Sequence, residues 1–133
     1  YGFLEPEHKA ALTVRDALHK VPDPKARTLL EGHNFQPGAK VYPGHTGSFI
    51  DLPSKTIKAG DHGVPGGENM IRYRDGSVRY FSAYEAKIIQ TFPSDYLISG
   101  SWGESLRQIG NAVPVTLATV IASSIYEKLN NNE

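Results

Sequence analysis

Apolar residues recur at helical intervals near both ends of the chain, and three of these stretches begin with a Ser or Thr that has an acidic residue three positions later. The three pairs are Thr13/Asp16, Ser82/Glu85 and Ser101/Glu104. In a capping box the two side chains bond to the main chain of the first turn, so each pair marks a helix start. We predict helices that end before Pro22, at Phe92 and at Gly110, because proline cannot continue a helix and glycine favours the left-handed conformation that terminates one.

A further helix is predicted at the C-terminus, with Pro114 in its first turn. Its apolar residues keep the helical i, i+3, i+4 spacing for four turns and form what we call the apolar stripe, Val113, Leu117, Val120, Ile121, Ile125 and Leu129. Burying one such side chain stabilises a fold by about 1.5–3 kcal/mol, so an exposed stripe forgoes much of the available stabilisation. We therefore expect a partner surface outside this chain, on an N-terminal domain or another chain; packing on the chain's own hairpin is the alternative.

The middle of the chain predicts short strands joined by turns. Nine of the thirteen glycines lie between residues 32 and 76, a density that favours turns over long elements. The Asp75-Gly76 pair between the β-rich segments 70–74 and 77–81 is typical of a hairpin, and residues 55–59 predict a further short strand. A helix, a Gly/Pro-rich β-containing middle and two or three helices together indicate a small α+β fold.

Composition limits the chemistry that the chain can supply. Its 133 residues correspond to one domain or part of one, and it has no cysteine, which excludes disulfides, thiolate nucleophiles and Cys-ligated zinc. Fourteen Lys+Arg balance fourteen Asp+Glu, so net charge indicates neither a nucleic acid nor an anionic membrane. We expect no apolar run near the ~18–20 residues that span a bilayer and no secretory signal, and hence a soluble, intracellular protein without a membrane partner.

Two groups of residues in the middle of the chain suit a ligand. His45, Asp61 and His62 offer metal ligands, but their spacing fits no compact motif, so we prefer histidines that bond to main-chain carbonyls in turns. The glycine-rich segment 60–68 has lysines and arginines around it, which suits a nucleic-acid backbone; a phosphate-binding loop, or glycines that only permit turns, are the alternatives. The chain has no Gly-x-Ser-x-Gly elbow and no Walker sequence, which argues against a self-contained enzyme.

Two segments near the C-terminus carry a specific resemblance. The sequence RYFSAYEAKIIQTFPSDY at 79–96 closely resembles the ninth conserved motif of the DNA cytosine-5 methyltransferases, and QIGNAVPV at 108–115 resembles the tenth. Residues 13–17 resemble the segment that follows the eighth motif, and residues 42–47 with 60–69 resemble one type of target recognition region. The resemblance extends from about residue 10 to residue 129. Val115 stands where a second proline is common, a minor departure.

The resemblance implies the C-terminal portion of such an enzyme. Residues 1–24 would be a connector from the large domain, 25–98 a small mixed target recognition lobe that includes the ninth motif, 99–129 the tenth motif and a helix, and 130–133 a tail. The flanking helices would pack on a Rossmann-like S-adenosylmethionine-binding domain outside this chain. The family's cofactor loop, Pro-Cys-Gln nucleophile and Glu-Asn-Val motif are not in these 133 residues, so we predict no catalytic residue and no metal ligand. We expect an excised fragment rather than the smaller subunit of a split enzyme, since the chain opens with Tyr1.

The resemblance also assigns roles to individual residues. It implies a lining for S-adenosylmethionine and the flipped cytosine from Gly110, Asn111 and Ala112. It implies DNA contacts from Lys55, Thr56, Ile57, Lys58, His62, Arg72 and Arg74. The ninth-motif residues that would hold the recognition lobe in place are Arg79, Glu85 and Gln90. For Arg79 an anchor inside the protein is preferred to a phosphate ligand, whereas phosphate contact and simple solvation stay open for Arg72 and Arg74.

The resulting hypothesis is a part of a DNA cytosine-5 methyltransferase that recognises the DNA target and completes the pocket for S-adenosylmethionine and cytosine, without being catalytic alone. Its expected partners are double-stranded DNA and the N-terminal catalytic domain or subunit of the same enzyme. Restriction–modification and a bacterial cytoplasm, close to the nucleoid, are expectations at the level of the family. A stand-alone, non-catalytic nucleic-acid-binding module is the alternative, and a small-anion site in residues 60–67 is a third hypothesis.

Overall fold

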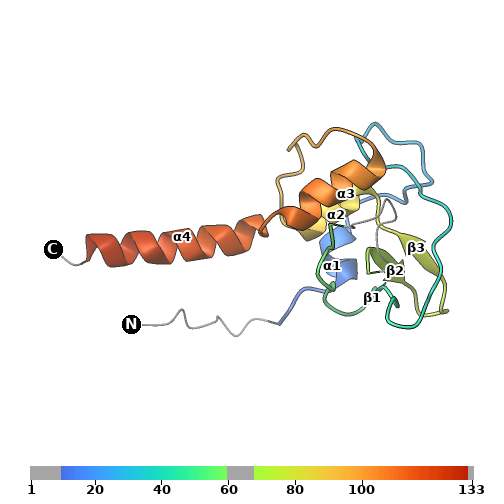
Figure 1. The fold of residues 1–133 in the computed structure, drawn as a ribbon, viewed down its shortest axis with the longest axis horizontal. Helices are drawn as coiled ribbons and strands as arrows, with labels where there is room; N and C mark the ends of the chain where they lie inside the picture. Colours follow the sequence, from blue (N-terminus) through green and yellow to red (C-terminus); the bar gives the residue numbers. More distant parts are fainter. Residues whose placement is uncertain (1–9, 60–67, 132–133) are drawn as a thin grey trace.

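The computed structural model describes residues 10–59 and 68–131. Seven elements follow one another in these ranges, namely α1 (Val14–Leu18), β1 (Ser48–Phe49), β2 (Met70–Arg72), β3 (Val78–Tyr80), α2 (Ala83–Ile89), α3 (Trp102–Asn111) and α4 (Val115–Asn130). The first six form a small body and α4 extends from it as a single helix (Figure 1). The expected small α+β fold is thereby confirmed. Asp61, His62 and the expectations attached to residues 60–67 lie outside the described residues.

The three strands form one sheet in the order β1–β2–β3, with β1 parallel to β2 and β2 antiparallel to β3. The predicted hairpin is confirmed, with Met70 opposite Tyr80. Its strands are shorter and its loop longer than the sequence indicated, because Gly76, at φ 84°, donates its N–H to the Tyr73 carbonyl and closes a wider turn. The strand predicted at 55–59 is wrong, since that segment joins no strand.

The predicted helix starts are confirmed at Thr13 and Ser82, where both halves of the capping box form. At Ser101 only one half is present. The Ser101 hydroxyl accepts the Glu104 N–H at 3.3 Å, but the Glu104 carboxylate turns outward to Arg107. The first and second helices end at Leu18 and at Ile89, the latter three residues before Phe92.

The core lies between the sheet and the first three helices. Its buried residues come from elements far apart in sequence, Val14, Ile57, Ile71, Phe81, Ala86, Leu106 and Ile109. Trp102 packs at the edge of this cluster and donates its indole N–H to the Phe81 carbonyl at 2.9 Å, so its polar atom is satisfied. The body is therefore held by contacts that span most of the described chain.

Helix α4 contributes nothing to this core, since none of its residues is buried. The members of the apolar stripe are 40 to 70% exposed, and in Figure 1 the helix projects away from the sheet and from the other helices. The alternative in which the stripe packs on the chain's own hairpin is therefore wrong, whereas the expected partner surface stays a prediction. Pro114 is the N-cap of α4 and not a member of its first turn.

The segment Trp102–Asn130 is long and apolar enough to cross a membrane by length and composition, because an 18-residue stretch within it has a mean hydropathy of 1.4. The expectation that no run approaches that length does not hold by this criterion. The segment is, however, two helices separated at Ala112, whose backbone is extended (φ −83°, ψ 148°). Its first half, α3, contributes Leu106 and Ile109 to the core. One such segment is weak evidence for a membrane span.

Candidate functional site

A groove of about 550 Å³ lies between α1, residues 53–57 and the C-terminal end of α2. Its walls are mainly apolar, and Gly110, Ala112 and Pro114 line it as well. Residues from the predicted DNA-contacting segment 55–58 and from the predicted cofactor segment 110–112 therefore share one depression. Neither Arg72 nor Arg74 is among its lining residues.

Helix α3 and the 55–59 segment touch main chain to main chain at Gly110. A Cβ atom on Gly110 would lie 2.4 Å from the Ala59 nitrogen and 2.6 Å from the Lys58 carbonyl carbon, so no larger residue fits without moving the backbone. The prediction that Gly110 ends the helix in a left-handed conformation is wrong. Gly110 is helical, α3 continues to Asn111, and the glycine is used for close approach.

Asn69 holds the 55–59 segment in this position. Its buried amide donates to the Lys58 carbonyl at 2.8 Å and accepts the Lys58 N–H at 2.9 Å. The main-chain carbonyl of Asn69 accepts the Phe81 N–H at 3.0 Å, which connects the Asn69–Lys58 contact to the end of the hairpin. These side-chain bonds satisfy the Lys58 main chain in place of a strand ladder, in a segment that joins no strand. Sequence reasoning missed Asn69; its place at the end of the glycine-rich segment was the only signal.

The four residues predicted as DNA contacts in this segment differ in what they offer. Ile57 is 2% exposed and packs in the core, so its side chain serves the fold. Lys55 Nζ donates to the Thr46 hydroxyl at 2.8 Å and lies 3.1 Å from Glu68 Oε2, an ion pair by distance without hydrogen-bond geometry. Thr56 and Lys58 have exposed side chains.

The two arginines of the hairpin have different surroundings. The Arg72 guanidinium lies over the Phe49 ring at 4.8 Å, and its Nε is buried without a hydrogen bond among the described residues. The Arg74 side chain is 80% exposed and pairs with Asp51, which also accepts from Arg15 Nε at 2.7 Å. Hydrogen bonds from Arg15 and then Arg74 lower the pKa of Asp51 to about 2.

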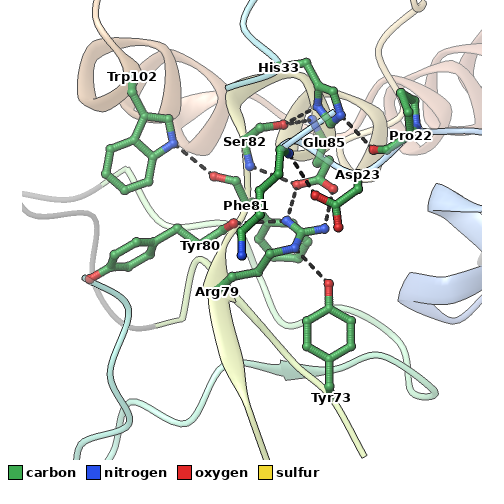
Figure 2. A network of polar contacts seen from close by, with 11 residues as sticks. Pro22, Asp23, His33, Tyr73, Arg79, Tyr80, Phe81, Ser82, Glu85 and Trp102 are labelled. Atoms are coloured by element: carbon green, nitrogen blue, oxygen red, sulfur yellow. Dashed lines mark hydrogen bonds and ion pairs between the residues drawn. The ribbon is translucent and has the colours of Figure 1, made fainter. Parts of the chain in front are cut away.

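Residues of the segment that resembles the ninth motif form a buried polar network around the start of α2 (Figure 2). Arg79 donates two parallel hydrogen bonds of 2.7 Å to the two oxygens of Glu85, and its Nε donates to the Tyr73 hydroxyl at 2.8 Å. Glu85 also accepts the Ser82 N–H. Burial alone would lower the pKa of Arg79, but the contact with Glu85 holds that pKa above its ordinary value. The Arg79 guanidinium thus points toward Glu85 and Tyr73, as Figure 2 shows, and its side chain is largely buried.

His33 extends this network to the segment after α1. One ring nitrogen lies 2.8 Å from the Ser82 hydroxyl and the other 2.8 Å from the Pro22 carbonyl. Because a carbonyl only accepts, Nε2 donates to Pro22, and in the neutral tautomer Nδ1 accepts from the Ser82 hydroxyl. The Ser82 hydroxyl in turn accepts the Glu85 N–H. His33 is buried; nothing in its local sequence marked it.

Gln90 connects the segment that resembles the ninth motif to the segment that resembles the tenth. Its side-chain amide donates to the Ile109 carbonyl at 3.1 Å and to the Ala112 carbonyl at 3.0 Å. The main-chain carbonyl of Gln90 accepts the Val115 N–H at 3.2 Å. The end of α3 and the start of α4 are therefore tied to the end of α2. Asn111 lies at this junction with an exposed side chain.

No group of three or more His, Asp or Glu residues that could hold a metal occurs within residues 10–59 and 68–131. His45 lies in a tight turn, where its N–H donates to the Tyr42 carbonyl at 2.9 Å and its carbonyl accepts the Tyr42 N–H at 3.1 Å. These bonds use main-chain atoms and do not involve the His45 imidazole, so the role predicted for that side chain stays a prediction.

The structure first defines the class of protein. It is a small α+β body with a buried polar network beside the hairpin, an apolar groove, and an exposed helix, α4, that projects from the body. The family model of C-5 cytosine-specific DNA methylases matches residues 16–127. The chain belongs to this family.

Several Type II methyltransferases are similar to it. M.HgiDI of Herpetosiphon aurantiacus is 31% identical over 125 residues, which cover 92% of this chain and 38% of that protein. M.SacI of Streptomyces achromogenes is 31% identical over 88% of this chain and 38% of its own length, and M.HindV of Haemophilus influenzae is 40% identical over 59% of this chain and 28% of its own. The chain thus spans well under half the length of these relatives.

Proposed function

We propose that this chain is the part of a DNA cytosine-5 methyltransferase that recognises the DNA target and completes the pocket for S-adenosylmethionine and the extruded cytosine. The observation that carries the proposal is the contact of the Lys58–Ala59 main chain with Gly110. In it the segment that would read DNA rests on the helix that would line the cofactor pocket.

Thr56, Lys58 and Arg74 are the side chains that would contact DNA. All three are exposed, and Lys58 and Arg74 carry the positive charge that neutralises phosphates. Arg74 would exchange part of its pairing with Asp51 for a phosphate, whereas Lys55 is held by Thr46 and Glu68. Phosphate contacts of this kind orient the duplex, while base contacts give the sequence preference.

Asn111 and Ala112 would face the cofactor. The space that a Cβ on Gly110 would need is filled by the main chain of Lys58 and Ala59. This glycine would therefore shape the pocket by letting that main chain approach α3. The exposed Asn111 amide offers one acceptor and two donors, which fits a polar ligand at the junction of α3 and α4. S-adenosylmethionine would supply the methyl group that is transferred to cytosine C5.

The apolar stripe of α4 would dock on the S-adenosylmethionine-binding domain, which is not part of these residues. Removing six large apolar side chains from water contributes about 1.5–3 kcal/mol for each one that becomes fully buried. The nucleophilic thiolate must also come from that domain, since this chain has no cysteine. Base extrusion would then be offset by contacts that both parts make with the duplex.

Reconstitution tests the proposal. Transfer of a labelled methyl group from S-adenosylmethionine to duplex DNA is measured with this chain alone, with the N-terminal catalytic part of the same methyltransferase alone, and with both together. We expect transfer only with both. Transfer by this chain alone, or by the N-terminal part at the full rate without it, would contradict the proposal.

A pair of α4 variants sharpens this experiment. Leu117→Glu introduces a charge into the apolar stripe, and Thr119→Glu introduces the same charge on the opposite side of α4. Both positions are exposed, so neither change disturbs the core of the described body. We expect Leu117→Glu to abolish reconstituted transfer and Thr119→Glu to retain it. If this chain binds duplex DNA equally well with and without Leu117→Glu and never assists transfer, the stand-alone nucleic-acid-binding module is the better interpretation.

A further inference from the structure

Thr91 follows the C-cap of α2 and bonds to the start of α4. Its backbone has a conformation that threonine disfavours. Thr91 has φ 59°, and it is the only residue other than glycine with a positive φ among residues 10–59 and 68–131. A β-branched side chain is a genuine outlier in this left-handed region. Such strain persists only where the surrounding contacts over-determine it, so it calls for a specific cause.

Thr91 occupies the position that glycine takes in a common helix ending. The Phe92 N–H donates to the Lys87 carbonyl and the Thr91 N–H to the Ile88 carbonyl, at 3.1 and 2.9 Å. This pair of bonds is the Schellman motif, in which the left-handed residue is usually glycine and sometimes asparagine. The motif explains the conformation of residue 91 but not the choice of threonine.

The start of α4 supplies the reason for a hydroxyl at residue 91. The N-cap of α4, Pro114, has no side chain that can cap the helix, and the first N–H groups of a helix need an acceptor. The Thr116 N–H donates to Thr91 Oγ1 at 2.9 Å, and the Val115 N–H donates to the Gln90 carbonyl at 3.2 Å. The cap of α4 is therefore provided by the two residues that follow α2.

These bonds also bear on the direction of α4. No residue of α4 is buried, so side-chain packing on the body contributes little to its orientation. Gln90 additionally holds the Ile109 and Ala112 carbonyls with its amide. The bonds from Gln90 and Thr91 thus span the end of α3, the bend and the start of α4.

We propose that Gln90 and Thr91 are positioning residues that fix the angle between the body and α4, and that the strain at Thr91 is retained because its hydroxyl caps α4. Resting on the proposed function, this angle would set where the DNA-contacting residues lie relative to the domain on which α4 docks. The residues touch neither substrate nor cofactor; they act through the direction of the helix.

The test measures the geometry of the isolated 133-residue chain, so its result does not depend on the proposed function. Because the chain has no cysteine, Lys20→Cys on the body and Ser123→Cys on α4 accept one spin label each, at two exposed positions. The distribution of distances between the labels reports the angle. Hydrogen exchange of the Thr116 amide reports the cap itself.

Three substitutions at residue 91 separate the hydroxyl from the backbone conformation. Thr91→Val removes the hydroxyl and keeps the branched shape, whereas Thr91→Gly removes the hydroxyl and relieves the strain. We expect both to broaden the distance distribution and to speed exchange of the Thr116 amide about fivefold, the effect of losing one ordinary hydrogen bond. Thr91→Ser keeps the oxygen and is expected to behave as the unmodified chain. If Thr91→Val fails to fold, Thr91→Gly carries the test, because glycine suits the left-handed position.

Thr119→Val is the matched control. Its hydroxyl donates to the Val115 carbonyl within α4, one turn away from the joint. We expect it to change neither the distances nor the exchange of the Thr116 amide. Wild-type behaviour of both Thr91→Val and Thr91→Gly would overturn the proposal, and so would an equal effect of Thr119→Val, which would assign the change to α4 itself.

Discussion

The contact between Gly110 and the 55–59 segment and the helix propensity of alanine predict opposite effects of Gly110→Ala on stability. Replacing a glycine inside a helix by alanine normally stabilises it by about 0.5–1 kcal/mol. At Gly110 the new Cβ would lie 2.4 Å from the Ala59 nitrogen, a main-chain atom that cannot turn aside. We therefore expect Gly110→Ala to destabilise the chain.

The magnitude follows from the two opposing effects. Forcing a methyl group into a packed site costs roughly 1–3 kcal/mol, and more when backbone must move. After the gain in propensity is subtracted, a net loss of about 2 kcal/mol is expected for Gly110→Ala. Gly103 lies in the same helix with nothing within 4 Å of its would-be Cβ. Gly103→Ala should therefore keep the gain of about 0.5 kcal/mol, at the lower end of the range because the residue lies in the first turn.

Urea denaturation followed by circular dichroism measures both variants. With a slope of about 1.5 kcal/mol/M, typical of a small protein, a loss of 2 kcal/mol lowers the midpoint by about 1.3 M. Gly103→Ala should raise the midpoint slightly. If Gly110→Ala is as stable as the unmodified chain, or if the two alanines act in the same direction, the close approach described here is wrong.

Two further predictions concern charged groups. Arg79→Met leaves the Glu85 carboxylate buried without its partner and is expected to lower the free energy of unfolding, measured by urea denaturation, by about 3–5 kcal/mol. Arg107→Met breaks the exposed pair with Glu104 and should change stability little. Equal effects of the two substitutions would contradict the assignment of the buried pair. Because the folded pKa of Asp51 lies at about 2, below its ordinary value of 3.8, its pairing stabilises the fold above pH 3.8 and is lost as pH falls towards 2. Asp51→Asn should therefore flatten the stability curve in that window, and an Asp51 carboxyl that titrates at its ordinary pKa by NMR would refute this reasoning.

The sequence predicted what depends on neighbouring residues. Thr13 and Ser82 mark true helix starts because a capping box is closed by groups three residues apart, whose geometry the chain itself fixes. The hairpin follows from Asp75-Gly76 for the same reason. The apolar stripe was visible as a periodicity, and its exposure followed from the shortage of chain to cover it.

Contacts between distant residues had to come from the tertiary structure. The 55–59 segment reads as a strand, but it joins no strand, and the buried amide of Asn69 satisfies the main chain of Lys58 instead. Gly110 reads as a helix stop, but the approach of Ala59 decides its use. His33 carried no signal at all, because its partners are 11 and 49 residues away.

The resemblance to methyltransferase motifs identified the family from residues that are close in sequence, and the family model matches residues 16–127. It did not indicate how the motifs are joined. That Gln90 holds the carbonyls of the tenth motif, and that Thr91 caps α4 across the bend, follows only from the fold. A linear pattern records which groups a residue carries, whereas the meeting of groups far apart in the sequence is decided by how the whole chain packs.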